Sequence, residues 1–299
     1  MIIGRAAGIC LDPESYGAKP WRWRSSAHAD SKSYAEHWAK VRQRGREWIG
    51  VLQEEVPKVQ VLLLFLSGTE FLTIDHSKIP SEVLAELEPA TSGQAADYSL
   101  YPAFVEGMLL GASDGTTIID GNEFSYYFPT GGDFGPYRQY HKDDAAGVYF
   151  STEAQAKYRS HMQLANALYP DFPYGAYMPS WSGANSLSDA EQDAWAKYCV
   201  TQAFLTTDRY VWTYSDNFDW HTTGMPGNFA GMITGGRRDA AASATRIVTF
   251  DAIDAEHLWQ PHSTAVPLDR DGRTGLRFAV PLDGDAYTPA MTTSPEGDG

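Results

Sequence analysis

The sequence predicts an α/β protein with parallel strands, most simply a (β/α)8 barrel of the TIM-barrel type. Three observations support this prediction. Short apolar runs alternate five times with segments of helical periodicity, acidic residues follow several of the runs, and no glycine-rich phosphate loop follows any of them. Alternating strands and helices are typical of parallel strands joined by right-handed crossovers. The lack of a phosphate loop favours a barrel over a doubly wound, dinucleotide-binding sheet.

The first two strands and the helix between them are expected before residue 67. The apolar run 8–11 ends at Asp12-Pro13-Glu14, where the proline biases the preceding residue away from helix and closes the strand. Residues 33–54 place apolar side chains on one helical face. The run VQVLLLFL, residues 59–66, is the second strand, and Glu70 lies in the loop that follows it.

The middle of the chain contains the stretch that predicts the site most directly, GTTIIDGNEFSYYF at residues 115–128. A helix is expected before it, at residues 99–111, and Thr117 to Ile119 fit a strand buried on both faces. Asp120-Gly121-Asn122 has the composition of a turn, so Glu123 is expected just beyond the carboxyl end of this strand. Residues 128–147 are expected to form a long loop, a lid or a binding loop.

Further helices and strands complete the alternation in the second half of the chain. Helices are expected at residues 151–168, 188–205 and 238–259, the second starting with a capping box of Ser188 and Glu191. Strands are expected at 174–178, followed by Trp181, and at 210–215, followed by the residues DNFDWH.

The barrel is expected to cover residues 1–265, followed by a partly disordered C-terminal extension at 266–299 that is rich in Pro, Gly and Asp. A barrel needs eight strands, so two or three are unaccounted for. We expect either that these strands lie upstream of Met1 or that the barrel is incomplete.

The composition excludes several classes of partner. With 23 basic and 38 acidic residues among 299, the formal charge of −15 argues against nucleic acids and anionic membrane surfaces. The 9 Trp, 17 Tyr and 13 Phe residues exceed what a core alone requires, and flat ligands such as sugars are a common reason for such an excess. A carbohydrate is therefore the expected partner.

Metal and cofactor sites are not expected. Only Cys10 and Cys199 are present, so there is neither a disulfide framework nor a CxxC zinc motif. The histidines lack HxH and HExxH spacing, and no serine lies in a GxSxG elbow. The start of the sequence has no signal-peptide pattern and no segment is long enough to span a bilayer, which predicts a soluble protein of undetermined compartment.

Carboxylates and aromatic rings are expected to gather where the parallel strands end. Hydrolysis of a glycosidic bond needs one carboxylic acid to protonate the leaving oxygen and one carboxylate to attack the anomeric carbon or activate water. The candidate catalytic residues are Asp12, Glu14, Asp120, Glu123 and Asp216. The candidate sugar-binding residues are Tyr16, Glu70, Tyr127, Trp181, Trp212, Trp220 and His221. Glu14 or Glu123 is expected to be the acid/base group, with Asp216 or Asp120 as nucleophile or orienting acid.

Three motifs carry a resemblance to a known group of proteins. GICLDPESY, IIDGNEFSYYF and YVWTYSDNFDW resemble the strand ends of bacterial glycoside-hydrolase-like (β/α)8 barrel proteins, over residues 1 to 260. The resemblance implies the barrel fold more than a substrate. The late motif departs from the group, which has Glu where this chain has Asp216. Asp12 and Glu14 are also similar, more distantly, to the Asp-x-Glu of chitinase-like barrels, which implies Glu14 as acid and Asp12 as the residue that orients an acetamido group.

Each candidate also has a structural interpretation. Asp12 before proline could cap a turn, Asp120 could cap the next element, and Glu123 and Glu70 could be solvated loop acids. Two other functions are compatible with the same pattern: a carbohydrate-binding barrel without turnover, and a hydrolase whose acids hold a divalent metal ion.

Overall fold

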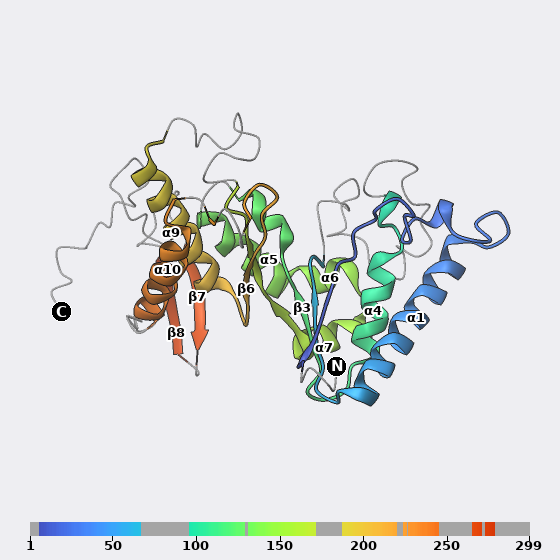
Figure 1. Cartoon of the computed structure of the whole chain (residues 1–299). Coiled ribbons are helices and arrows are strands. Elements are labelled where there is room, and N and C mark those ends of the chain that lie inside the picture. The colour runs from blue at the N-terminus through green and yellow to red at the C-terminus, as the bar shows by residue number, and fades with distance from the viewer. Residues whose placement is uncertain are drawn as a thin grey trace. The chain divides into compact units, whose positions relative to one another are not determined.

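The computed structural model describes residues 6–66, 96–128, 131–171, 187–219, 224–225 and 227–244, and the backbone of 265–270 and 273–278. The chain forms two compact units (Figure 1). Unit 1 comprises Met1–Phe124, Tyr140–Ala167 and Thr207–Trp212. Unit 2 comprises Ser125–Gln139, Leu168–Thr206 and Thr213–Gly299.

Unit 1 contains a four-stranded parallel sheet in the order β1-β2-β3-β4. Its strands are β1 (Gly8–Leu11), β2 (Gln60–Leu63), β3 (Thr117–Asp120) and β4 (Met162–Leu164). Each strand pairs with the next one along the chain, which confirms the predicted parallel α/β class. These four strands alone do not form a closed eight-stranded barrel.

One face of this sheet is buried under helices α1 (Tyr34–Glu55), α4 (Tyr101–Gly111) and α7 (Thr152–His161). Alternate strand residues point to the same side, so Val61, Ile118 and Met162, which pair in register, share this face. They belong to one hydrophobic core with Ile49 of α1 and Met108 of α4. On the opposite face Gln60 and Leu62 of β2 are partly exposed, whereas Ile119 of β3 is fully buried.

Helix α1 begins with a capping box. The side chain of Ser33 accepts a hydrogen bond from the backbone N–H of Glu36, and the Glu36 carboxylate accepts one from the N–H of Ser33. These bonds, and one from Lys32, lower the pKa of Glu36 to about 2. The capping box places the start of the helix within one residue of the predicted position.

Helices α1 and α4 cross with their backbones in contact. A Cβ atom added at Gly45 would lie 2.0 Å from the carbonyl oxygen of Phe104, and one at Gly107 would lie 2.0 Å from that of Arg42. Any side chain at either position would prevent this approach. The two glycines therefore set the distance between the helices.

Unit 2 is built mainly from helices. α9 (Asp189–Thr206) packs on α10 (Phe229–Ala244), where an ion pair of 2.6 Å joins Lys197 to Asp239. The unit also contains η5 (Gly131–Asp133) and an antiparallel hairpin of β7 (Ala265–Arg270) and β8 (Arg273–Phe278). The expected C-terminal extension thus includes regular structure.

Four short elements each contain residues that belong to both units. They are η4 (Glu123–Tyr127), α5 (Phe134–Asp143), β5 (Asn166–Leu168) and β6 (Val211–Thr213), the last two of which pair in a two-stranded sheet. The remaining short elements, η1 (Trp23–Ser25) and α6 (Ala145–Tyr149), belong to unit 1.

Three sequence predictions were wrong. The expected loop at 128–147 contains η5, α5 and α6, because Phe134 anchors α5 in the core despite the many Gly and Asp residues around it. The helix expected at 151–168 ends at His161, and β4 follows because residues 162–164 pair with β3. Tertiary pairing there outweighs the helix propensity of Met, Gln and Leu. The helix expected from residue 238 begins at Phe229. The strand expected at 174–178 lies outside the described residues.

Candidate functional site

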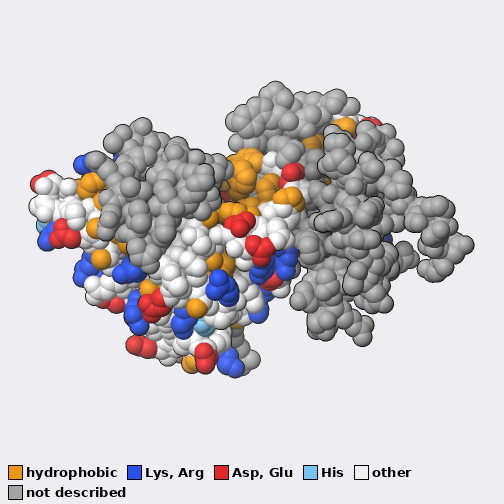
Figure 2. Space-filling view, turned by 180° about the vertical axis from the view of Figure 1, so that it is seen from behind, with side chains coloured by type: hydrophobic (Ala, Val, Ile, Leu, Met, Phe, Trp, Pro, Cys, Tyr) orange, Lys and Arg blue, Asp and Glu red, His pale blue; other side chains and the backbone are white. Residues whose placement is uncertain are grey.

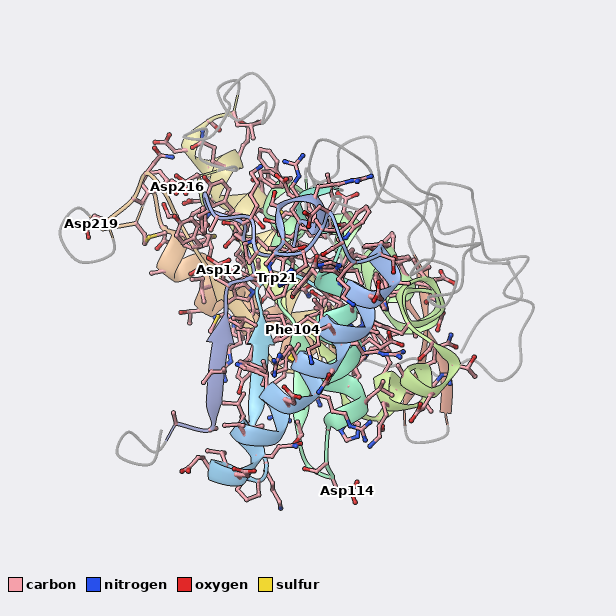
Figure 3. All side chains as sticks on the ribbon, turned by 90° about the vertical axis from the view of Figure 1, so that its right-hand side faces the viewer. Asp12, Trp21, Phe104, Asp114, Asp216 and Asp219 are labelled. Carbon is pink, nitrogen blue, oxygen red and sulfur yellow. The ribbon has the colours of Figure 1, made fainter. Side chains whose placement is uncertain are left out.

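The carboxyl ends of β1 and β3 lie at one edge of the unit 1 sheet. Leu11 pairs with Leu63 and Leu63 pairs with Asp120, so the strands end level with one another. Figure 3 shows Asp12 at this edge and Asp114, which precedes β3, at the opposite end of the unit. The segments that follow β1 and β3 therefore leave the sheet on the same side.

The segment after β1 is held in a defined turn. The Asp12 carboxylate accepts a hydrogen bond of 2.8 Å from the backbone N–H of Glu14, which is the geometry of an Asx turn. The Ser15 N–H donates to the Tyr98 hydroxyl at 2.9 Å, and the Trp21 indole N–H donates to the Pro13 carbonyl at 2.6 Å. Asp12 is exposed and Glu14 is half-buried. Asp12 thus stabilises the turn from which Glu14 projects.

Asp120, at the end of β3, is fully buried, with 0% exposure. Its Oδ1 accepts hydrogen bonds from the backbone N–H groups of Leu66, at 3.0 Å, and Asn122, at 2.9 Å. Its Oδ2 lies 3.7 Å from Nε2 of His141. The carboxylate therefore connects the segment after β2 to the segment after β3, and its burial favours a positioning role over contact with a substrate.

The turn after Asp120 requires a glycine at its first position. A Cβ on Gly121 would lie 2.5 Å from the carbonyl oxygen of Leu63 and 2.6 Å from that of Leu64. The N–H of Gly121 donates to the Leu63 oxygen at 2.7 Å, and the N–H of Glu123 donates to the Leu64 oxygen at 3.0 Å. The backbone of Glu123 is thus fixed against β2, while its side chain is half-buried.

Side chains from two other strands support the same turn. Asn122 adopts a left-handed conformation, with φ of 49°, and its Nδ2 donates to the Oδ1 of buried Asn166 at 2.9 Å. The indole N–H of Trp212, on β6, donates to the Gly121 carbonyl at 2.8 Å. Trp212, expected to bind sugar, is therefore a half-buried residue that holds the turn before Glu123.

The pKa of the Cys10 thiol, on β1, is affected by acids of both segments. Desolvation raises the pKa of its thiol, and the negative charges of Asp12 and Glu123 raise it further. Asp12 and Glu123, which are distant in sequence, thus both lie within electrostatic range of this thiol.

Two residues under this edge were missed in the sequence analysis. His141, on α5, is 1% exposed and faces Asp120, and the Tyr158 hydroxyl donates to the His141 carbonyl at 2.9 Å. Burial, together with the negative charge of Asp120, raises the pKa of Tyr158 well above its usual value. His141 lies in the segment that was expected to be a loop, and it has no metal-type spacing that could have identified it.

A second cluster of candidate residues forms within unit 2, around Asp216. The Tyr169 hydroxyl donates to Asp216 Oδ2 at 2.8 Å, and the Tyr214 hydroxyl donates to Oδ1 at 2.6 Å. Burial, the hydrogen bond to Asp216 and the charges of Asp171 and Asp216 raise the pKa of Tyr169, and Tyr127 contributes in the same direction. Tyr127 and Asp216, both predicted site residues, thus lie near the same phenol.

The tyrosine rings of this cluster pack on one another. The rings of Tyr169 and Tyr214 are stacked with centroids 6.4 Å apart, and those of Tyr126 and Tyr214 are stacked at 6.2 Å. Tyr214 and Tyr169 were missed as site residues. The first of them lies within the motif YVWTYS, whose tyrosine directly precedes Ser215 and Asp216.

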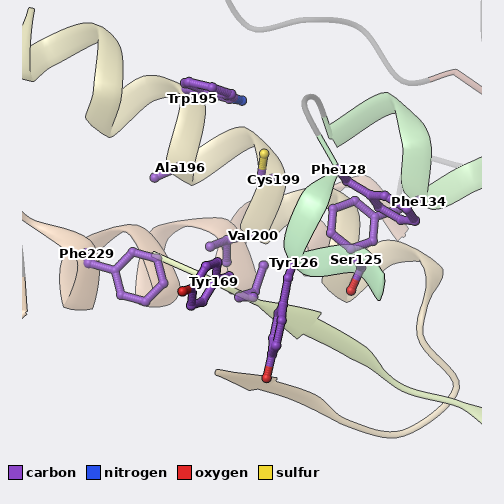
Figure 4. A pocket seen from close by; sticks show the side chains of 11 residues that line it. Ser125, Tyr126, Phe128, Phe134, Tyr169, Trp195, Ala196, Cys199, Val200 and Phe229 are labelled. Carbon is purple, nitrogen blue, oxygen red and sulfur yellow. The ribbon is translucent and has the colours of Figure 1, made fainter. Parts of the chain in front are cut away.

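Unit 2 also contains a small apolar pocket, which Figure 4 shows between α9, α10 and the segment around Tyr126. Its lining includes Tyr126, Tyr169, Trp195, Cys199 and Phe229. The cavity volume of about 30 Å³ has room for about two water molecules. A sugar ring does not fit into this space.

Of the remaining predicted sugar-binding residues, one lies within the described part of the chain. Tyr16 is 74% exposed on the loop after β1. Glu70, Trp181, Trp220 and His221 lie outside the described residues.

No group of three or more His, Cys, Asp or Glu side chains is arranged to hold a metal ion within the described part of the chain. None of the described helices combines the length and the apolar character needed to cross a membrane. On the face shown in Figure 2, Lys and Arg side chains are interspersed with Asp and Glu side chains. Comparison of the chain with protein-family models, with curated proteins and with solved structures finds no match.

Proposed function

We propose that this chain is a glycoside hydrolase that acts on an oligo- or polysaccharide through carboxylates at the carboxyl edge of the parallel sheet. The observation that carries the proposal is that β1, β2 and β3 are parallel and end level with one another, so the acidic segments after β1 and β3 leave the sheet at the same end. Two acidic segments at one sheet edge are the arrangement that α/β enzymes use for catalysis.

The proposal includes a (β/α)8 barrel of which the four described parallel strands form an arc. Two observations support it. The strands follow one another in sequence order without the reversal that a doubly wound sheet has. The face away from the helices carries the partly exposed Gln60 and Leu62 beside the fully buried Ile119, and a mixture of polar and buried apolar side chains is expected for residues directed towards a barrel interior.

Glu14 and Glu123 are the proposed working pair within unit 1. Both side chains are half-buried, so a substrate can reach them while contact with water is reduced. One of them would protonate the leaving oxygen and the other would attack the anomeric carbon or activate water. Carboxyl groups about 5 Å apart would retain the anomeric configuration, and groups about 6.5–9.5 Å apart would invert it. Asp120 would position the turn before Glu123, and the participation of Asp216 stays a prediction.

The main alternative is carbohydrate binding without turnover. One observation favours it: both carboxylate oxygens of Asp216 are already bound by tyrosine hydroxyls. A carboxylate engaged in this way is better suited to hold a ligand than to attack one.

The proposal is tested by screening aryl glycosides and oligosaccharides with the wild type, Glu14→Gln and Glu123→Gln. A matched control is Asp114→Asn, which removes an exposed acid at the opposite end of the unit (Figure 3). Loss of general acid/base catalysis should lower turnover by about 10²- to 10⁴-fold in one or both glutamine variants. The control should stay within about twofold of the wild type. Turnover that survives both glutamine substitutions would refute this site.

A further inference from the structure

We infer that unit 2 carries a binding platform for a neutral sugar ring, formed by Tyr127 and Tyr214 beside the Asp216 carboxylate. The inference rests on the proposed function in taking the ligand to be a carbohydrate. It concerns binding by unit 2 alone and assigns the platform no part in bond cleavage.

Two exposed tyrosines pack on the same buried ring: Tyr127 and Tyr214 lie with their centroids 6.3 and 6.2 Å from that of Tyr126. Tyr127 is 41% exposed and Tyr214 is 47% exposed, whereas Tyr126 and Tyr169 beneath them are 6% and 5% exposed. The C–H face of a pyranose packs on an aromatic face, and a tyrosine that is partly apolar and partly polar suits such a ligand. The exposed rings provide that surface.

The platform is held in place before any ligand binds. The Tyr214 ring is nearly parallel to that of Tyr169, with an interplanar angle of 7°, and its hydroxyl is bound to Asp216. Buried Tyr126 packs on Tyr169 with centroids 4.9 Å apart. A ring that is already held in place loses little conformational entropy on binding, which favours affinity.

A polar group, the Asp216 carboxylate, lies next to the Tyr214 ring. Asp216 is exposed, and each of its oxygens accepts one phenol hydrogen bond. A carboxylate oxygen has two lone pairs, so each can accept a second hydrogen bond from a sugar hydroxyl. Asp171, with 0% exposure, accepts hydrogen bonds from the backbone N–H and the side-chain Nδ2 of Asn217, at 2.9 and 2.6 Å. These bonds fix the loop that carries Asp216.

The platform carries negative charge. Asp171 and Asp216 form no ion pair with a Lys, Arg or His among the residues that the structure describes. Two carboxylates that pair with no described cation disfavour phosphorylated sugars and uronic acids, because like charges repel. The platform therefore suits neutral sugars, whose hydroxyls donate hydrogen bonds to carboxylates.

The inference is tested by isothermal titration of the full-length chain with cellohexaose, xylohexaose, maltohexaose and chitohexaose. The Glu14→Gln, Glu123→Gln double variant is used so that cleavage does not interfere. In this background Tyr214→Ala should weaken the binding of the hexasaccharide with the highest affinity by about tenfold, which is the effect of losing one aromatic contact. Tyr214→Phe keeps the ring and should weaken it less. Tyr210→Ala, which removes a tyrosine of similar exposure (40%) from unit 1, should leave binding unchanged.

The outcomes separate the platform from the proposed activity. Binding that depends on Tyr214 in a wild-type chain without turnover would support the platform and refute the hydrolase. Turnover by the wild type together with equal affinities of Tyr214→Ala and Tyr210→Ala would refute the platform alone. Failure of all four hexasaccharides to bind would overturn the inference, provided that circular dichroism shows a folded protein.

Discussion

Replacing the buried Asp120 tests most directly how the carboxyl edge of unit 1 is held together. Its Oδ1 accepts two backbone hydrogen bonds, from Leu66 and Asn122, at a position with 0% exposure. Asp120→Ala removes the acceptor and leaves both N–H groups buried without it. Asp120→Asn keeps an oxygen acceptor of the same shape but removes the charge opposite His141.

The two variants should differ clearly in the free energy of unfolding. Each backbone N–H that is left buried without a partner costs about 1–3 kcal/mol, so Asp120→Ala should lose about 2–6 kcal/mol. Asp120→Asn retains both hydrogen bonds and loses the negative charge that faces His141, which should cost about 1–2 kcal/mol. A loss of 3 kcal/mol corresponds to a decrease in Tm of roughly 6–12 °C for a domain of this size.

Urea denaturation followed by circular dichroism gives the two free energies, with Asp114→Asn as the control for loss of an exposed acid. Activity is measured on the same proteins below their unfolding transitions. If Asp120 positions the turn before Glu123 rather than reacting, folded Asp120→Asn should keep substantial activity. Equal and small destabilisation by Asp120→Ala and Asp120→Asn would show that the hydrogen bonds from Leu66 and Asn122 contribute little to stability. Complete inactivation of folded Asp120→Asn would refute the positioning role of Asp120.

Three further predictions follow from local geometry. Gly45→Ala should destabilise the protein by about 1–3 kcal/mol, because the added methyl group would collide with helix α4. Gly50→Ala, where no atom lies within 4 Å of the added Cβ, should stabilise α1 by about 0.5–1 kcal/mol. Urea midpoints of the two variants that shift in the same direction would contradict this prediction. Glu123→Gln should speed the alkylation of Cys10 at pH 8, measured in a variant that lacks Cys199, because removing a negative charge lowers the pKa of the Cys10 thiol. An unchanged alkylation rate would show that Glu123 does not lie near Cys10. The folded pKa of Glu36, about 2, lies below its ordinary value of 4.5, so its stabilisation is complete above pH 4.5 and is lost as the pH falls towards 2. The Tm of Glu36→Gln should therefore be below that of the wild type at pH 7 and converge with it near pH 2.

Elements with strong local signals could be predicted from the sequence. The capping box of Ser33 and Glu36 starts α1, and apolar runs bounded by proline or by turn residues mark β1, β2 and β3. The signals failed where neighbours distant in sequence decide the structure. Residues 162–164 become a strand because β3 offers an edge, and no pattern within those three residues shows this.

The placement of the candidate acids at the strand ends could also be predicted. Asp12, Glu14 and Glu123 follow apolar runs closely, and parallel strands bring such positions to one edge. The residues that support them could not be found, because their roles are defined by contacts. Trp212 was expected to bind a sugar, and no sequence pattern showed that its indole N–H binds the carbonyl of Gly121, which lies 91 positions earlier in the chain.

The crossing of α1 and α4 has a consequence for directed evolution of this protein. Since Gly45 and Gly107 bring main chain against main chain, no rotamer there can adapt to a substitution nearby. Substitutions in the exposed part of the segment after β1 will therefore be tolerated better than substitutions at this crossing. Libraries that randomise the exposed Tyr16 and Ala18 and leave both glycines untouched should yield the larger share of folded variants.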